Sequence, residues 1–314
     1  MSGSLSVVVP VHNEEGVIPS LFDRLRGVLN GLGDPWEVIF VDDGSTDGSW
    51  HVISSLCTRH HGARGIRFTR NFGKEAAIYA GLKASRGDAV VVMDADLQHP
   101  PELIPKMVEA WRDLGTPIVE AVKERRQDES LMRRLGAGLF YRLFERTSGI
   151  DLENATDFKL LDRKVVNIYL DFNERTRFFR GLTAWMGLPA ARIPFVPAGR
   201  KDGGASRWST KGLIGLGVGS IISFSSSPLR IVTYLGVFTL LGSILLGIQT
   251  LLVKLRGDAV PGFATVILVQ LILGSVLMIA LGLIGEYLAR MYEEVKARPL
   301  YLVAEWAGED KVQD

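Results

Sequence analysis

The sequence is poor in several features that would each indicate a class of protein. A single cysteine, Cys57, excludes an internal disulfide framework and fits a reducing compartment. The formal net charge is only +1, so the charge balance indicates no general attraction to nucleic acid or anionic surfaces. The first residues, MSGSLSVVVPVHNEE, lack the basic start and the apolar core of a signal peptide, so we expect none. The sequence also contains no internal repeat and no low-complexity tract.

Long apolar runs, in contrast, are present in the C-terminal third of the chain. Residues 231–253 carry no charged side chain, and neither do residues 259–285. A helix needs roughly 20 apolar residues to cross the core of a bilayer. Two buried core helices are the alternative, but uncharged runs of this length are rare in soluble domains. We therefore predict two transmembrane helices, at about 231–253 and 260–285, within a membrane region at 230–287.

Two spans return the chain to the side of the membrane on which it started. The domain at 1–209 and the tail at 288–314 should therefore share one face. Basic residues flank both spans on that face, which favours the cytoplasm, although Lys254 and Arg256 in the loop between the spans weaken this preference. The apolar but interrupted segment at 210–229 is predicted to lie in the membrane interface before the first span.

The N-terminal part alternates between short apolar runs and stretches with helical spacing. We expect strands at 5–10, 36–43, 65–70, 89–96 and 117–122 and helices at 16–29, 49–61, 74–85 and 101–114. Further on, we expect helices at 130–149 and 175–187, a strand and a helix within 157–172, and a strand followed by a glycine-rich basic loop within 191–209. This alternation predicts an α/β fold with a mostly parallel sheet and helices on both faces.

Polar clusters follow the carboxyl ends of the first four predicted strands. In chain order they are PVHNEE, DDGSTD, RNFGKE and DADLQ. In sheets of this kind, ligands bind beyond the carboxyl ends of the strands. Four clusters from separate strands should converge on one crevice, and this convergence is stronger evidence for a site than any single motif.

Asp94 and Asp96 stand two residues apart at the end of the fourth predicted strand. Such residues of an extended segment point the same way, and two carboxylates so placed repel unless a cation lies between them. Hard oxygen ligands suit Mg²⁺ or Mn²⁺, which usually takes one or two carboxylates plus substrate phosphates. A solvated strand end or a helix cap is the alternative. His99, shortly after the pair, is expected to be structural.

The other clusters also have simple structural explanations. Asp, Gly and Ser form turns, so Ser45 or Asp47 could cap the next helix while Asp43 accepts hydrogen bonds from a base edge. The HNEE stretch could equally start a helix, with Asn13 as its cap.

Seven motifs together resemble one enzyme family. VVVPVHNEE, VDDGSTDGS, RNFGKEAAIYAGL and VVMDADLQHPPE resemble the donor-binding half of family 2 glycosyltransferases, which have the Rossmann-like GT-A fold. ATDFKLLDR, RTRFFRGL and GASRWS resemble the acceptor half of the branch that includes dolichol-phosphate mannose synthase and the bacterial bactoprenol glucosyltransferases. The resemblance covers nearly the whole chain in order, and it implies an integral protein of the bacterial inner membrane with a cytoplasmic catalytic domain.

The resemblance also implies roles for individual residues. Asp94, Asp96 and Gln98 would hold Mg²⁺ or Mn²⁺, with Asp96 nearest the diphosphate and counted as catalytic. The nucleotide diphosphosugar would contact Pro10, His12, Glu14, Asp43, Ala95, Lys123, Arg200 and Arg207. Three residues depart from the family's usual pattern. The family usually has an aromatic residue at the position of His12, often arginine at that of Lys123 and often lysine at that of Arg207. An arginine can grip a phosphate with two hydrogen bonds where a lysine acts as a point charge.

The resemblance also implies that the acceptor site contains Asp157, Arg177 and Arg180. Asp157 occupies the position usually offered as catalytic base, but a phosphate nucleophile is largely ionised near neutral pH, with a second pKa of about 6. Orienting the acceptor or the sugar hydroxyls, or capping a helix, is an alternative role for Asp157. Arg177 and Arg180 lie three apart and, on one helix face, could grip the lipid phosphate; a solvated basic face is the alternative.

The implied reaction is an inverting, metal-dependent transfer of a hexose, with UDP-glucose as the first choice of donor, to polyprenyl (undecaprenyl) phosphate. The product would be a lipid-linked sugar for glycosylation of the cell envelope. A GDP-mannose-using mannosyltransferase and a membrane-anchored nucleotidyltransferase are the alternatives, while the absence of a Q-x-x-R-W motif opposes a processive polysaccharide synthase. The family also implies a homo-oligomer, a tetramer, in which the tail at 298–306 could pair as an added strand.

Overall fold

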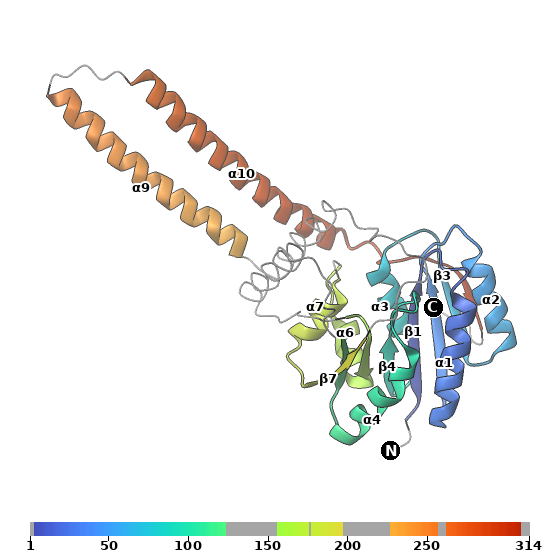
Figure 1. Cartoon of the computed structure of the whole chain (residues 1–314). Coiled ribbons are helices and arrows are strands. Elements are labelled where there is room, and N and C mark those ends of the chain that lie inside the picture. Colours follow the sequence, from blue (N-terminus) through green and yellow to red (C-terminus); the bar gives the residue numbers. More distant parts are fainter. Residues whose placement is uncertain (1–2, 124–155, 176, 197–226, 257–261, 309–314) are drawn as a thin grey trace. The chain divides into compact units, whose positions relative to one another are not determined.

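The computed structural model describes residues 3–123, 156–175, 177–196, 227–256 and 262–308 (Figure 1). The chain divides into two compact units. The first comprises residues 1–145, 149–209 and 298–314, and the second comprises residues 146–148 and 210–297. The C-terminal tail therefore belongs to the first unit, together with the N-terminal part of the chain.

Within the described residues, the first unit is built on an eight-stranded sheet with the order β7-β5-β6-β4-β1-β2-β3-β8. The strands are β1 Leu5–Val11, β2 Trp36–Asp42, β3 Ala63–Phe68, β4 Ala89–Val92, β5 Ile118–Lys123, β6 Lys159–Asp162, β7 Ala190–Phe195 and β8 Val303–Ala307. The central strands β4, β1, β2 and β3 are parallel, as are β5 and β7. β6 runs antiparallel between β4 and β5, and β8 runs antiparallel along β3. The sheet is therefore mixed, and the prediction of a mostly parallel sheet holds for its centre.

Helices cover both faces of this sheet, as predicted. They are α1 Ile18–Leu32, α2 Ser49–Arg59, α3 Lys74–Ala84, η1 Pro101–Leu103, α4 Ile104–Leu114, α6 Arg163–Asp171 and α7 Phe179–Trp185. Alternate residues of a strand face opposite sides of a sheet. Val7 and Val9 accordingly join the core beneath α1, α2 and α4, whereas Ile39 and Val41 join the core beneath α3. A side chain at Gly81 would overlap Val8, so α3 packs closely on the sheet.

Most of the predicted helices and strands are confirmed, with shifted boundaries. The fourth strand ends at Val92, so Asp94 and Asp96 lie in the loop beyond it and not on the strand itself. The helix predicted at 175–187 is shorter and begins only at Phe179. The helix predicted at 130–149 and the glycine-rich basic loop lie outside the described residues. So does the interfacial segment predicted at 210–229, except for residues 227–229, which belong to the long helix that begins at Ser227.

The second unit contains two long helices, α9 Ser227–Leu255 and α10 Phe263–Lys296, which contact each other (Figure 1). Large apolar side chains such as Phe238 and Ile279 are exposed along them. Among the described residues, one stretch, Ile272–Lys296, is long and apolar enough to cross a membrane, and Tyr234–Leu246 is a shorter apolar helix. Both predicted helices are thus present, and the structure supports one candidate membrane span.

The tail forms an added strand as predicted, but it pairs within the chain, whereas the prediction connected this pairing with a tetramer. β8 extends the sheet beyond β3, with Gly65 opposite Ala307 and Ile66 opposite Trp306. β8 is the outermost strand on this side of the sheet, and it places the C-terminal tail beside the carboxyl end of β3.

Candidate active site

All four predicted polar clusters contribute residues to one cavity at the ends of β1, β2 and β4. The cavity has a volume of about 230 Å³ and is lined by Pro10, Val11, His12, Glu14, Asp43, Lys74, Asp94, Ala95 and Asp96. Apart from Val11 and Lys74, every one of these residues is a predicted site residue. The convergence expected from parallel strands is therefore present, because their carboxyl ends lie at one edge of the sheet.

Lys74, the first residue of α3, connects this cavity to the predicted acceptor side. Its Nζ lies 2.5 Å from Asp94 Oδ1 and 2.6 Å from Asp157 Oδ2. Burial opposes its charge, but the carboxylates of Asp94 and Asp157 raise the pKa of Lys74 above its ordinary value. Sequence reasoning assigned Lys74 no role, although it stands in RNFGKE, one of the four clusters. The signal that could have identified Lys74 was a lysine within such a cluster, at the start of a predicted helix.

Asp157 holds two cations and is itself buried. Arg180 donates from Nε to Oδ1 at 2.6 Å and from Nη2 to Oδ2 at 2.8 Å, a bidentate contact, while Lys74 binds Oδ2 as well. Burial alone would raise the pKa of Asp157, but Arg180 and Lys74 hold it well below its usual value. A carboxylate that stays ionised accepts protons poorly. This geometry favours the positioning role for Asp157 over that of catalytic base.

Arg177 does not act beside Arg180, which corrects the prediction that both lie on one helix face. Arg177 precedes α7, and it is buried with 8% of its surface exposed. Its guanidinium donates to the carbonyl oxygens of Tyr169 and Phe172 and lies 4.0 Å from the ring centroid of Tyr79. These contacts tie Arg177 to the C-terminal end of α6, and of the two arginines Arg180 is the one that contacts Asp157.

Glu75 is a second titratable residue, after Lys74, that sequence reasoning missed. Its Oε2 accepts a hydrogen bond from the Phe179 N–H at 2.8 Å, which links α3 to the start of α7. Burial and the nearby Asp157 raise the pKa of Glu75 to about 7. The acceptor side of the crevice therefore contains a carboxyl group that titrates near neutral pH.

The loop after β4 presents Asp94 and Asp96 to the same cavity. The Asp94 N–H donates to Nδ1 of His99 at 3.1 Å, and the His99 ring is buried and stacked on Phe158. Burial lowers the pKa of His99, which keeps the ring neutral and able to accept this hydrogen bond. The expected structural role of His99 agrees with these contacts. At the other side of the loop, the Gln98 N–H donates to Asp96 Oδ1 at 3.1 Å.

These residues fit a metal site that a ligand completes. Among the described residues, no group of three or more His, Cys, Asp or Glu side chains could hold a metal ion. Asp94 and Asp96 nevertheless line one cavity, and a lysine ammonium already neutralises Asp94. Mg²⁺ usually binds one or two carboxylates and takes its remaining ligands from water and phosphates. Gln98 does not line this cavity, so its role as a ligand stays a prediction.

Asp43 is engaged by backbone N–H groups. Its Oδ1 accepts from Phe72 N at 2.7 Å, and its Oδ2 accepts from Gly73 N at 3.0 Å. Burial raises the pKa of Asp43, and these hydrogen bonds oppose the rise. Asp43 thus fastens the loop before α3, in addition to lining the cavity where the base was predicted to bind.

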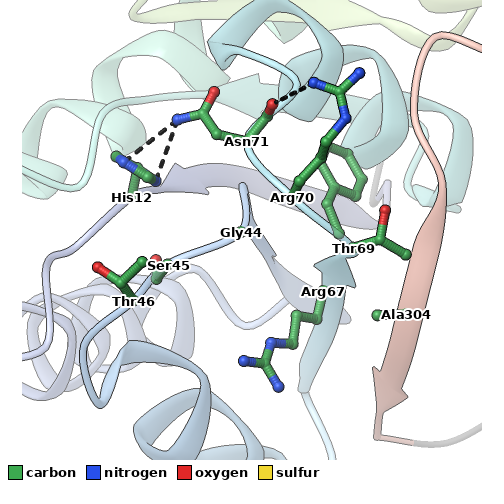
Figure 2. A pocket seen from close by; sticks show the side chains of 10 residues that line it. His12, Gly44, Ser45, Thr46, Arg67, Thr69, Arg70, Asn71 and Ala304 are labelled. Atoms are coloured by element: carbon green, nitrogen blue, oxygen red, sulfur yellow. Dashed lines mark hydrogen bonds between the residues drawn. The ribbon is translucent and has the colours of Figure 1, made fainter.

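A larger cavity of about 530 Å³ lies beside the first and shares His12 with it (Figure 2). It is lined by His12, Gly44, Ser45, Thr46, Arg67, Phe68, Thr69, Arg70, Asn71 and Ala304. In Figure 2 the Asn71 amide points toward His12, with its Nδ2 3.3 Å from the imidazole Nε2. The lining comes from the loops after β1, β2 and β3, the end of β3 and the C-terminal strand β8.

The remaining predicted residues lie at the margin or outside. Lys123 is the last residue of β5. Burial and the positive charge of Arg180 lower the pKa of Lys123, and the negative charges of Asp96 and Asp94 oppose this change. Lys123 is therefore close enough to feel the charges of the crevice. Arg200 and Arg207 lie outside the described residues.

Comparisons with known proteins show which family the chain resembles. The model of glycosyl transferase family 2 matches residues 6–169, and the model of the GtrB C-terminal hairpin matches residues 227–291. An uncharacterized glycosyltransferase of Synechocystis sp. is 41% identical over 98% of this chain and 97% of its own. A bactoprenol glucosyl transferase of Shigella phage SfII is 37% identical over 95% of this chain and 97% of its own. A crystal structure of glucosyl-3-phosphoglycerate synthase from Mycobacterium tuberculosis with Mn²⁺, UDP-glucose and phosphoglyceric acid is 23% identical, covers 70% of this chain and 78% of its own, and has a TM-score of 0.48.

Proposed function

The chain belongs to glycosyl transferase family 2, and on that basis we propose that it transfers a hexose from a nucleotide diphosphosugar to polyprenyl phosphate. UDP-glucose is the first choice of donor, and undecaprenyl phosphate is the first choice of acceptor. Relatives that match over nearly their whole length are named bactoprenol glucosyl transferases, and the C-terminal hairpin model supports the same branch. GDP-mannose is the alternative donor.

The observation that carries the proposal is the continuous charge network across the crevice. Asp94 lines the donor cavity, Lys74 binds both Asp94 and Asp157, and Arg180 binds Asp157. Cations and carboxylates alternate from the predicted donor side to the predicted acceptor side. A reaction between two phosphate-bearing substrates needs this arrangement, because both bring negative charge into one crevice.

The two cavities suit the two parts of a nucleotide sugar. The larger one offers guanidinium, amide and hydroxyl groups to a nucleoside, and the smaller one offers Asp94 and Asp96 to a metal-bound diphosphate. A bound Mg²⁺ or Mn²⁺ would supply positive charge that stabilises the departing diphosphate. Asp94 and Asp96 would hold that ion, and Lys74 would then be released from Asp94 to face the substrates.

The acceptor phosphate requires no general base. Its oxygen is already ionised near neutral pH, with a second pKa of about 6, so no proton has to be removed before it attacks the anomeric carbon. Asp157 instead orients Arg180 and Lys74, whose positive charges attract the acceptor phosphate and hold it in place. A single displacement of this kind inverts the anomeric configuration.

The C-terminal helices would anchor this reaction to the membrane. We propose that α9 and α10 form the two predicted spans, in the bacterial inner membrane, with the catalytic domain in the cytoplasm where nucleotide sugars are made. The boundaries at 1–209, 210–229, 230–287 and 288–314, and a homotetramer, are parts of the same proposal. The exposed apolar side chains along both helices support a lipid environment.

An assay with the purified full-length chain in detergent tests this proposal. It would combine undecaprenyl phosphate, Mg²⁺ or Mn²⁺, and a panel of UDP-glucose, GDP-mannose and UDP-linked amino sugars. We expect transfer from UDP-glucose, with an inverted anomeric centre in the product measured by NMR coupling. Retention of configuration would contradict the single displacement. Transfer from none of the donors would overturn the proposed function and favour the nucleotidyltransferase alternative.

A further inference from the structure

We propose that the C-terminal strand β8 forms one wall of the nucleoside pocket, so that the segment following the second long helix is part of the donor site. This inference rests on the proposed use of a nucleotide sugar. It concerns Ala304 and Glu305, to which the sequence assigned no role. Both residues belong to the same compact unit as the larger cavity.

Ala304 lines the larger cavity because the ladder between β3 and β8 is irregular. Arg67 pairs with Glu305, and Phe68 pairs with Val303, which leaves Ala304 as an extra residue between the two pairs. A bulge of this kind locally redirects a side chain, and bulges are common beside active sites. Figure 2 shows Ala304 on β8, beside Thr69 and Arg67 of the neighbouring segment.

Glu305 positions an arginine of the cavity. Its Oε1 lies 2.6 Å from Nη1 of Arg67, and its Oε2 accepts a hydrogen bond from Nε1 of Trp50 at 3.0 Å. Arg67 keeps 34% of its side-chain surface exposed and lines the cavity. Arg67 Nε also lies 3.7 Å from Asp42 Oδ2 of β2, so Glu305 and Asp42 together orient this cavity guanidinium, and the tail also closes one side of the cavity.

The tail is held at this edge by contacts beyond the ladder. The ring of Tyr301 stacks on Phe68, with centroids 4.8 Å apart and an angle of 17° between the planes. The N–H of Thr69, another cavity residue, donates to the Leu302 carbonyl at 3.0 Å. These contacts fix the tail against Phe68, the last residue of β3, and against Thr69, which follows it, so the wall is a specific part of the fold.

The lining chemistry indicates a nucleoside as the occupant. The cavity volume of about 530 Å³ lies within the range of roughly 300–1,000 Å³ that is usual for small-molecule sites. Hydroxyl and amide groups can hydrogen-bond a base and a ribose, and the guanidiniums of Arg67 and Arg70 can stack on a planar ring. His12 is shared with the cavity of Asp94 and Asp96, so a nucleoside here would place its diphosphate there.

The decisive variant is Ala304→Trp, which fills the cavity from the tail side. Its matched control is Ala190→Trp, the same substitution at an exposed position of the strand at the opposite edge of the sheet. In the full-length chain, Ala304→Trp should raise the Kd for UDP and the KM for UDP-glucose at least about tenfold, which corresponds to about 1.4 kcal/mol. The KM for undecaprenyl phosphate should stay at the wild-type value, and the control should match wild type throughout.

Glu305→Gln provides a second test that keeps the size of the side chain and its acceptor for Trp50. Losing the charge beside Arg67 should raise the Kd for UDP by a smaller factor, about threefold, and less at high salt. If Ala304→Trp lowers the thermal stability, Glu305→Gln decides the question. If Ala304→Trp is folded and binds UDP with the wild-type Kd, the proposed role of β8 is overturned. If Ala304→Trp is destabilised, a wild-type Kd for UDP in Glu305→Gln has the same meaning. Neither result would contradict the proposed enzymatic function. Failure of the wild-type chain to bind any nucleotide would instead overturn the proposed function.

Discussion

Two pairs of closely spaced aspartates stand at the ends of the strands on either side of β1, and their carboxylates have different partners. Asp42, the last residue of β2, and Asp43, which follows it, are buried and accept hydrogen bonds from backbone N–H groups. Asp94 and Asp96, after β4, line an open cavity, where Asp94 is bound by a lysine ammonium and Asp96 is exposed. Backbone amides cannot leave a carboxylate without unfolding the loop, whereas a lysine side chain can move away. The first pair therefore builds the site and the second pair is available to a ligand.

The largest effect should come from Asp96→Asn. Because this carboxylate is proposed to serve the departing diphosphate, its loss should lower kcat by about 10²–10³-fold, as for other groups that stabilise transition-state charge. The thermal unfolding temperature should not change, because Asp96 is exposed. Asp113→Asn, at an exposed position of α4, is the matched control and should keep wild-type turnover. A wild-type kcat in Asp96→Asn would contradict the proposal that Asp96 stabilises the departing diphosphate.

Lys74→Met tests whether the cation on Asp94 is exchangeable. Losing the ammonium that aligns Asp94 and Asp157 should reduce kcat about a hundredfold, the effect expected for misplaced catalytic groups. With the lysine gone, Mg²⁺ or Mn²⁺ should raise the thermal unfolding temperature of the variant more than that of wild type, measured by differential scanning fluorimetry. Lys83→Met, at an exposed position of the same helix, is the control. Equal metal-induced shifts in variant and wild type would contradict an exchangeable cation.

Asp43→Asn should mainly lower stability, whereas Asp96→Asn should mainly lower kcat. An asparagine offers one acceptor oxygen where the carboxylate offers two, so a buried N–H of Phe72 or Gly73 loses its partner. We expect the free energy of unfolding to fall by about 1–3 kcal/mol, measured by urea titration. Turnover of the remaining folded protein should fall less than in Asp96→Asn. A variant as stable as wild type would show that the first pair is not structural.

Glu75→Gln should have the smallest effect and should show it only as a change in pH dependence. Burial and Asp157 raise the pKa of Glu75 from 4.5 to about 7, so the folded chain binds this proton more tightly than the unfolded chain. Its contribution to stability is therefore fully present below pH 4.5 and is lost as the pH rises through about 7. Glutamine keeps an acceptor for the Phe179 N–H without this loss.

Thermal unfolding across this pH range measures the effect. We expect Glu75→Gln to match wild type near pH 4.5 and to be the more stable of the two above about pH 7. Parallel stability profiles for the two proteins would show that Glu75 does not titrate in the folded chain.

Much of the site could be predicted because it depends on local patterns combined with one rule of topology. The alternation of apolar runs and helical spacing located the parallel strands, and parallel strands place their carboxyl ends at one edge. The clusters PVHNEE and DADLQ were predicted to converge for this reason. The resemblance to family 2 glycosyltransferases then selected Pro10, His12, Glu14, Asp94 and Asp96 within them, and all five line one cavity. The structure changed the detail at β4, where the strand ends before the aspartates and a loop presents them.

The sequence by itself determined which strands and helices form and which polar clusters share an edge, because these follow from patterns within about ten residues. Only the tertiary structure decided that β8 lies beside β3, that Lys74 binds both Asp94 and Asp157, and that Arg177 turns to the backbone while Arg180 faces the crevice. Pairing between segments far apart in the chain, and the direction of a long flexible side chain, depend on which partners the whole fold brings within reach. No spacing along the chain records those distances.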